Sequence, residues 1–548
     1  CHYLVQSVFK AISGCSYLHL QQNYLENLCQ VLLKKTQTGK SIPNRIYSSY
    51  AECLSCLANV HSELEMFDEA SNEYEEVLKI RRVLGQNTEE GAKDVATAIN
   101  NLSSLYEELH KYEAAEAGYK EALKIRCELM KLDSSLYKDD YAQTLCDMAD
   151  LHRKLDRYEE SETEYEKAIE IRRQLAQDGD NYLLKKYAVA LNDLAIMYRD
   201  MEKFSLAEKE YEISLNSSRE LARKQPDLYT EDVAIVLNNL AICHKKQHLY
   251  KIAEQEYWEA LGIRRMMASK NQDAYLIDVA ITLNNLAILH NEANKQDDSE
   301  KEYQEVITIF RRLAAKNPDA HKARLAIAIN NLASLYYMTK RFDNAEAEYK
   351  EALRIFSELA EDNPDAYNAP YSMFLNNVAV VHVDLGRYED AEIEHLESLK
   401  IRRSLAENNP EVYNGVVAMS LNNLALLKMK MKNYEEASLL YSEALEIRKQ
   451  LAENSPDAYN NDLVISLNDL AFCKLSMNQL TEALEYINEA IRIEPMLELF
   501  DSKGEILMRL NRFGEALSVY NRILEMEPTY FENNHTEFYK LLFNELRQ

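Results

Sequence analysis

The chain has 548 residues, 47% of them hydrophobic, so it is long enough for several domains and apolar enough to fold. It contains only 11 glycines and 9 prolines, too few for the turns and linkers of several sheet-containing domains, which indicates an almost purely helical protein. Its 91 acidic and 63 basic residues give a net charge of −28, which disfavours binding to nucleic acid and to anionic membrane surfaces.

The first residues carry no targeting signal. The segment 1–20 has a short apolar patch but no basic start and no clean cleavage site, and no run of 18 apolar residues occurs anywhere in the chain. We therefore predict a cytoplasmic protein with no membrane span. Because the sequence begins with Cys1 instead of Met, we expect a processed chain or a piece of a longer one.

Two short motifs near the N-terminus are weak. The sequence TGKS at 38–41 is similar to the end of a phosphate-binding loop, but Lys34 stands where that loop needs glycine, and no strand precedes it. Cys53 and Cys56 form a C-x-x-C without a second half, among nine scattered cysteines that fit a reducing compartment. We interpret both cysteines as small buried side chains and predict no cofactor and no metal.

From about residue 46 the sequence repeats every 46 residues. An asparagine recurs at this interval seven times, and Asn100 lies two intervals before the first of them, with Cys146 in the intermediate place. The seven are Asn192, Asn238, Asn284, Asn330, Asn376, Asn422 and Asn468. Each unit has two halves with helical periodicity, such as 325–341 and 342–367, and a tail such as NPDAY (363–367) that ends one helix and opens the turn to the next.

The second half of each unit carries a small residue followed four residues later by an aromatic one. A methyl-sized side chain lets two helix backbones approach closely, and the aromatic ring fills the space beside it. The small residues are Ala115, Ser161, Ala207, Ala253, Ser299, Ala345, Ala391 and Ala437, and the tyrosines are Tyr119, Tyr165, Tyr211, Tyr257, Tyr303, Tyr349 and Tyr441. We therefore predict that these positions are buried between paired helices.

The order L-x-x-L-A-x-x-[YH] followed by A-x-x-x-Y-x-x-A resembles the tetratricopeptide repeat, and "LNNLA" with "EAL.IR" is especially similar to kinesin light chains and their bacterial relatives. The family unit usually has 34 residues, so the extra dozen is expected in a longer second helix and a longer connection. Near the C-terminus Gly504, Ala516, Tyr520 and Pro528 match the 34-residue form. The resemblance implies an all-α, right-handed α-solenoid, a superhelix of antiparallel helix pairs with about eleven repeats.

The domain organisation follows from these spacings. We predict N-terminal capping helices in 1–45, an array of 46-residue repeats in 46–495, one ordinary repeat in 496–530 and a closing helix in 531–548.

The paired asparagines are the main candidate binding residues. In this family the first helices line the concave surface, and the resemblance implies that their amides bind the backbone of an extended peptide. The alternative is that the amides bridge neighbouring repeats, and both roles can hold. The predicted groove residues are Asn192, Asn238, Asn239, Asn284, Asn285, Asn330, Asn331, Asn376, Asn377, Asn422, Asn423 and Asn468, with apolar neighbours Ile196, Ile242, Ile288, Val380, Leu426 and Phe472 between them.

A basic cluster at the ends of first helices is a second candidate. It comprises Arg153, Lys154, Arg199, Lys245 and Lys246, with Lys428, Lys430 and Lys432 further on. Such cations could receive an acidic segment or a terminal carboxylate of a partner, or they could simply neutralise helix C-termini. Five histidines, His61, His152, His244, His290 and His382, occupy the place that Tyr106, Tyr198 and Tyr336 hold in other repeats, and we interpret them as fillers of an aromatic slot.

No nucleophile–base pair and no set of metal ligands stands out, so we predict no catalytic residues and no enzyme. The sequence predicts a scaffold that binds a peptide or protein segment in its concave groove. The alternative is a sensor or regulatory arm of a larger effector, attached to or associated with an NTPase or protease module, because bacterial relatives are often fused in this way. Nucleic-acid binding by the basic cluster is the weakest option.

Overall fold

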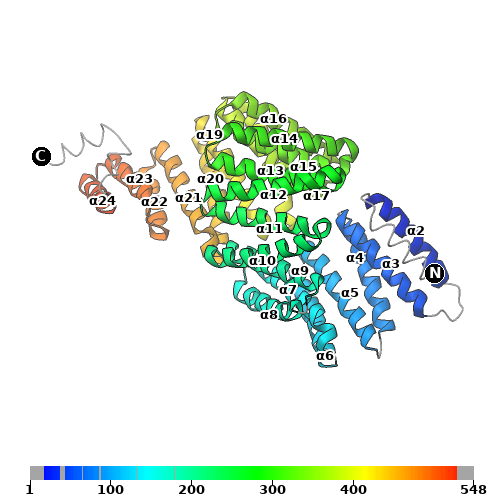
Figure 1. Cartoon of the computed structure of the whole chain (residues 1–548). Helices are drawn as coiled ribbons and strands as arrows, with labels where there is room; N and C mark the ends of the chain where they lie inside the picture. Colours follow the sequence, from blue (N-terminus) through cyan, green and yellow to red (C-terminus); the bar gives the residue numbers. More distant parts are fainter. Residues whose placement is uncertain are drawn as a thin grey trace. The chain divides into compact units, whose positions relative to one another are not determined.

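The computed structural model describes residues 18–36, 44–64, 66–85, 88–132, 134–177 and 179–527. Every regular element in these ranges is an α-helix, and consecutive helices pack against one another from Leu18 to Glu292 and from Pro318 to Met526 (Figure 1). The predicted all-α solenoid is therefore confirmed. The TGKS motif and the predicted closing helix lie outside the described residues. None of the helices in the described ranges has the length and hydropathy of a membrane-spanning segment.

The helices after α2 (Leu18–Thr36) form eleven pairs. The first helices are α3 (Asn44–Glu63), α5 (Glu89–Glu108), α7 (Ser134–Lys154), α9 (Asn181–Asp200), α11 (Pro226–Lys246), α13 (Gln272–Glu292), α15 (Pro318–Met338), α17 (Pro364–Asp384), α19 (Pro410–Lys430), α21 (Pro456–Ser476) and α23 (Leu497–Arg509). The second helices are α4 (Phe67–Leu84), α6 (Tyr112–Leu132), α8 (Tyr158–Ala176), α10 (Phe204–Lys224), α12 (Tyr250–Lys270), α14 (Gln296–Lys316), α16 (Phe342–Asp362), α18 (Tyr388–Asn408), α20 (Tyr434–Asn454), α22 (Leu480–Ile493) and α24 (Phe513–Met526).

The chain divides into two compact units, Cys1–Ile309 and Phe310–Gln548, which are treated separately below as unit 1 and unit 2.

The expected longer connection between repeats is wrong. A single residue, Asn363, separates α16 from α17, and both helices have 21 residues. Proline keeps the residue before it out of the helical region, so Asn363 takes ψ 86° and interrupts the helix, while Pro364 fits the first helical position. The Asn363 side chain accepts a hydrogen bond from the Ala366 N–H. The NPDAY tail is thus the start of a first helix, and the extra length lies in both helices.

The small and aromatic positions form the core between paired helices, as predicted. Ala207 and Ala253 are fully buried, and Tyr211 and Tyr257 beside them have no exposed surface. Where serine replaces alanine it remains buried because its hydroxyl donates to a carbonyl of the facing helix, as Ser161 does to the Ala149 oxygen at 2.7 Å. This close packing covers the side of each first helix that faces its paired second helix and leaves another side in contact with solvent.

Candidate binding face on the first helices

One side of the first helices carries apolar side chains that stay in contact with solvent. On seven consecutive first helices, α9 to α21, the residue three places before the first asparagine is large, apolar and 39% to 47% exposed. These residues, which we call the apolar row, are Val189, Ile235 and Ile281 in unit 1 and Ile327, Met373, Met419 and Ile465 in unit 2. The row was not predicted, although its 46-residue spacing is visible in the sequence, because apolar residues on a helix are normally assigned to the core.

The apolar neighbours that were predicted lie on the same face. Positions −3, 0, +1 and +4 relative to the first asparagine share one side of an α-helix. Ile196, Ile242 and Ile288 are half-buried there in unit 1, whereas Leu426 and Phe472 of unit 2 are 50% and 61% exposed. In each unit separately, we call the surface formed by the apolar row, these predicted neighbours at position +4 (the second row) and the asparagine pairs between them the first-helix face.

The asparagine pairs connect each repeat to the next. In unit 1 the Asn239 Nδ2 donates to the Asn192 Oδ1 at 3.0 Å, and the Asn285 Nδ2 donates to the Asn238 Oδ1 at 3.1 Å. In unit 2 the equivalent bonds join Asn377 to Asn330 at 2.9 Å and Asn423 to Asn376 at 2.8 Å. The asparagine that accepts each of these bonds is buried. Bridging between repeats is therefore observed, while a role in recognition stays a prediction. The other predicted members, Asn284, Asn331 and Asn468, are half-buried at the equivalent places of α13, α15 and α21.

An aspartate replaces the second asparagine in three repeats. The Asn100 Nδ2 donates to Asp147 at 2.7 Å, and the Asn422 Nδ2 donates to Asp469 at 3.3 Å. Asp193 has no such donor in the preceding repeat, because Cys146 stands in the place of the first asparagine. Burial and the nearby Asp150 carboxylate together raise the pKa of Asp193 to about 7. This carboxyl group therefore titrates near neutrality.

Replacing Asn376 with alanine is expected to lower the free energy of unfolding by about 1–2 kcal/mol, because the partly buried Asn423 amide then loses its acceptor. The measurement is the shift of the thermal unfolding midpoint. Asn461→Ala provides the control, since this asparagine is exposed on α21 of the same unit. Equal midpoints for the two variants would contradict a bridging role for the buried amide.

The predicted basic cluster is largely neutralised by the chain itself. Arg153 pairs with Asp200 at 3.0 Å, Lys154 with Glu107 at 2.7 Å and Lys245 with Glu292 at 2.8 Å. Arg199 also contacts Asp200, at 2.9 Å, and Lys246 is exposed. In unit 2 Lys428 contacts Glu392 at 2.6 Å. Because most of these ion pairs join one helix to another, the cluster contributes to contacts between helices, and a role in binding an acidic partner stays a prediction.

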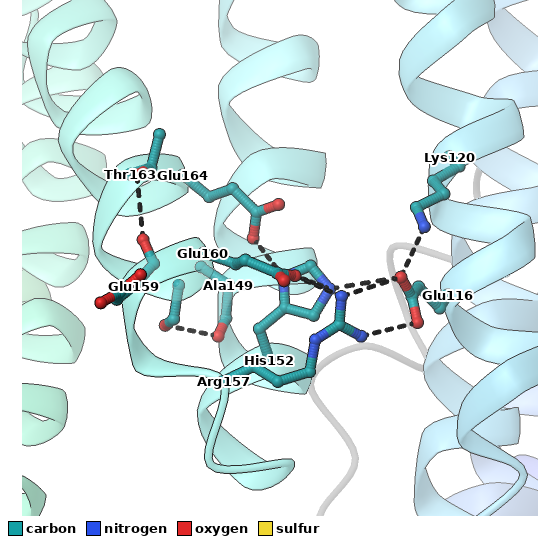
Figure 2. A network of polar contacts seen from close by, with 10 residues as sticks. Glu116, Lys120, Ala149, His152, Arg157, Glu159, Glu160, Thr163 and Glu164 are labelled. Carbon is teal, nitrogen blue, oxygen red and sulfur yellow. Dashed lines mark hydrogen bonds and ion pairs between the residues drawn. The ribbon is translucent and has the colours of Figure 1, made fainter.

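The five histidines lie in the slot that tyrosine fills in other repeats, and each also contacts a carboxylate, a polar role that was not predicted. Figure 2 shows His152 among carboxylates from two helices. Its Nδ1 lies 2.8 Å from the Glu164 Oε2, and its Nε2 faces Glu116 and Glu160 at 3.6 Å. Arg157 contacts Glu116 at 2.9 Å and also pairs with Glu160. His61, His244, His290 and His382 each contact the glutamate twelve residues later at 2.8 to 2.9 Å.

The His152 network predicts a pH-dependent contribution to stability. Burial disfavours the imidazolium, but the hydrogen bond and negative charge of Glu164 outweigh burial and raise the pKa of His152 above its usual value. The favourable protonation is therefore complete below the unfolded pKa of about 6.5 and is lost as pH rises through the folded pKa. The variant His152→Tyr carries the residue that the next repeat has at the same position, Tyr198. It should be less stable than the wild type at pH 6 by about 1 kcal/mol. Thermal unfolding at pH 6 and pH 9 should show this difference shrinking, and a constant difference would contradict the charge effect.

The described cysteines are all free. Cys53 is fully buried, and burial raises the pKa of the Cys56 thiol to about 11, which keeps it protonated and disfavours nucleophilic use. Within the described ranges no group of three or more His, Cys, Asp or Glu side chains is arranged to hold a metal ion.

Paired helices with an open face of first helices in each unit define a repeat protein of the α-solenoid class. Models of the tetratricopeptide repeat match residues 51–90, 95–135, 140–217, 279–319, 325–365, 371–450, 416–494 and 497–530. These matches cover most of the chain, which therefore belongs to the tetratricopeptide repeat family, whose members generally serve as scaffolds for protein–protein interaction.

Among solved structures, the crystal structure of BtubC (BKLC) from P. vanneervenii is similar, with 22% identity, a TM-score of 0.38, and coverage of 45% of this chain and 92% of that one. No curated protein matches the chain.

Proposed function

We propose that this protein is a scaffold that binds a segment of a partner protein along the first-helix face. The observation that supports the proposal is the apolar row, which recurs at one position on three consecutive first helices of unit 1 and four of unit 2. Single exposed apolar residues are common on protein surfaces, but a contiguous set on neighbouring elements is typical of a binding surface. Consecutive first helices such as α9, α11 and α13 touch, so their row members are neighbours in space.

The amides between the two apolar rows retain capacity for a ligand. In the bridging bonds Asn239 and Asn377 each use one N–H of the side-chain amide. An asparagine amide has two N–H donors and a carbonyl acceptor, so the second asparagine of a pair can bridge repeats and still bond to the backbone of an extended peptide. Apolar side chains of that peptide would then contact the two apolar rows, one on each side of the asparagine pairs.

The test compares two double variants of equal chemistry in unit 1. Ile235→Glu with Ile281→Glu places two charges on the first-helix face, at positions 39% and 42% exposed. Leu206→Glu with Ile252→Glu places two charges on second helices, at positions 41% and 44% exposed. Affinity capture from native lysate, read by mass spectrometry, should lose a partner at least tenfold with the first variant only. Equal capture by both variants, with unchanged thermal unfolding, would contradict the proposal.

The other predicted roles have less support. Ion pairing within the chain leaves the basic cluster little free charge for an acidic segment or for nucleic acid. A regulatory arm of a larger effector rests on the resemblance alone, and coding sequence upstream of Cys1 in the native gene would favour it. The absence of catalytic activity and the cytoplasmic location stay predictions.

A further inference from the structure

On the second helices from α6 to α20, one buried position holds a large side chain in every repeat but one. At intervals of 46 residues it is occupied by arginine five times and by phenylalanine twice, and all seven side chains are buried. The arginines are Arg126, Arg172, Arg264, Arg402 and Arg448, and the phenylalanines are Phe310 and Phe356. The exception is Ser218 of α10.

The large side chains fill a space between two successive first helices, and in four of the five arginine repeats a hydroxyl 18 residues later faces the guanidinium, whereas Arg172 bonds to the Lys186 carbonyl and to Gln143. The Arg264 Nη1 donates to the Asp278 carbonyl at 3.2 Å and to the Thr282 hydroxyl at 2.5 Å. Arg448 bonds in the same way to the Asp462 carbonyl at 3.0 Å and to the Ser466 hydroxyl at 2.6 Å. The acceptors lie 14 and 18 residues after the arginine, so the chain shows repeatedly how a guanidinium is held at this place.

At Ser218 the space is empty. The residue 18 places later is Val236, which cannot accept a hydrogen bond, and a cavity of about 200 Å³ lies between α9, α10 and α11. It is lined by Lys185, Ala188, Val189, Asn192, Asp193, Ser214, Ser218, Leu221, Asp232, Ile235 and Val236. Val189 and Ile235 belong to the apolar row, so the cavity opens on the first-helix face. Since a water molecule takes roughly 30 Å³ in the liquid, the end of a long side chain fits.

The walls of the cavity combine apolar surface with two carboxyl groups and the Lys185 ammonium group. Ala188, Leu221 and Val236 are apolar and suit the methylene stem of a long side chain. One oxygen of Asp232, Oδ1, pairs with Lys185 at 3.0 Å, whereas the other, Oδ2, is buried and has no hydrogen-bond partner among the described residues. Asp193 also lines the cavity; its Oδ1 accepts a hydrogen bond from the Asn192 Nδ2 at 3.2 Å, but it has no amide donor from the preceding repeat.

We propose that this cavity binds the guanidinium of an arginine side chain from the partner segment, in the place that the chain's own arginines fill in five other repeats. The proposal rests on the proposed function, because it places the partner on the first-helix face. The guanidinium pairs with the Asp193 carboxylate and lies beside Asp232, while its stem packs against the apolar wall.

A phenylalanine ring is the main alternative occupant, because Phe356 fills the equivalent place and stacks on Phe374 with ring centroids 4.4 Å apart. A ring in the cavity would cover the Asp193 carboxyl group without offering it a hydrogen-bond donor, which costs free energy that a guanidinium avoids. The chemistry of the walls therefore favours arginine.

The experiment titrates the full chain by calorimetry with three peptides, acetyl-Gly-Arg-Gly-amide and its counterparts with citrulline or phenylalanine in the middle position. Citrulline keeps the shape of arginine without its charge. The arginine peptide should bind at least ten times more tightly than either counterpart. Binding should be lost in Ser218→Arg, which fills the cavity from within, and kept in Ser218→Ala, which leaves it open.

Equal binding of the arginine peptide to wild type and Ser218→Arg would overturn the proposal, as would tighter binding of the citrulline or phenylalanine peptide. Should Ser218→Arg fail to fold, Asp232→Asn is the second variant, and it should weaken arginine binding at least tenfold. The proposed function is tested separately from the ligand of the cavity. If charges at Ile235 and Ile281 abolish partner capture but the arginine peptide does not bind, the face is a binding surface and only the cavity's ligand is wrong.

Discussion

Replacing Arg264 with serine is expected to lower the free energy of unfolding around α12 and α13 by roughly 3 kcal/mol, because it empties a filled buried site. The Arg264 side chain is 5% exposed, and its guanidinium bonds to Thr282 and to the Asp278 carbonyl. Serine would leave a cavity like the one at Ser218 and a buried threonine hydroxyl without this donor. The large side chain at this position therefore stabilises the contact between repeats.

The measurement is native-state hydrogen exchange of the α12 and α13 amides, because an array of repeats opens locally and a single global midpoint averages over units. Arg265→Ser is the control, since the neighbouring Arg265 is 45% exposed and pairs with Glu305 at 2.7 Å on the surface. A second comparison adds Thr282→Val, which reproduces the Ser218 and Val236 combination and should recover part of the loss. If Arg264→Ser and Arg265→Ser have equal effects, the buried arginine is not a structural element.

The sequence predicted features that every repeat shares. The small residue at Ala253 and the ring at Tyr257 recur with the same period as the fold, so their burial follows from the pattern alone. The apolar row was missed for the opposite reason, because periodic apolar residues such as Ile281 are assigned to a core, and only the packing shows that no helix covers them. The boundary at Asn363 was misplaced because Asn-Pro was read as a loop, although it also begins a helix.

The asparagine pairs show a limit of another kind. A side-chain amide donates and accepts with equal ease toward a neighbouring repeat or toward a ligand, so composition cannot decide between the two roles. The bond from Asn239 to Asn192 settles where one N–H goes, and it moves the expected source of binding energy from the amides to the apolar rows. Binding specificity then depends on positions where the repeats differ. In unit 1, Cys146 replaces the asparagine that would donate to Asp193, and Ser218 replaces the buried arginine of the neighbouring repeats.

Replacing Asp193 with asparagine is expected to stabilise the protein, and by roughly 2 kcal/mol more at pH 8 than at pH 5. Burial raises the pKa of Asp193 to about 7 in the folded state, and Asp150 acts in the same direction, whereas the Asn192 hydrogen bond and the charges of Arg172 and Arg153 oppose the rise. The folded state then holds a proton that the unfolded chain releases near pH 4, so stability falls as pH rises from about 4 to about 7. Asparagine stays neutral throughout this range and removes that loss.

Hydrogen exchange of α9 and α11 at the two pH values measures the effect, with Asp227→Asn as the reference. Lys270 holds the pKa of Asp227 below its usual value, so that carboxylate is ionised at both pH values, and the effect of its replacement should not change between them. A gain that is equal at pH 5 and pH 8 would mean that Asp193 does not titrate in this range. A gain that is larger at pH 8 than at pH 5 would identify Asp193 as a destabilising group, and the same substitution should then weaken binding of the arginine peptide at pH 8.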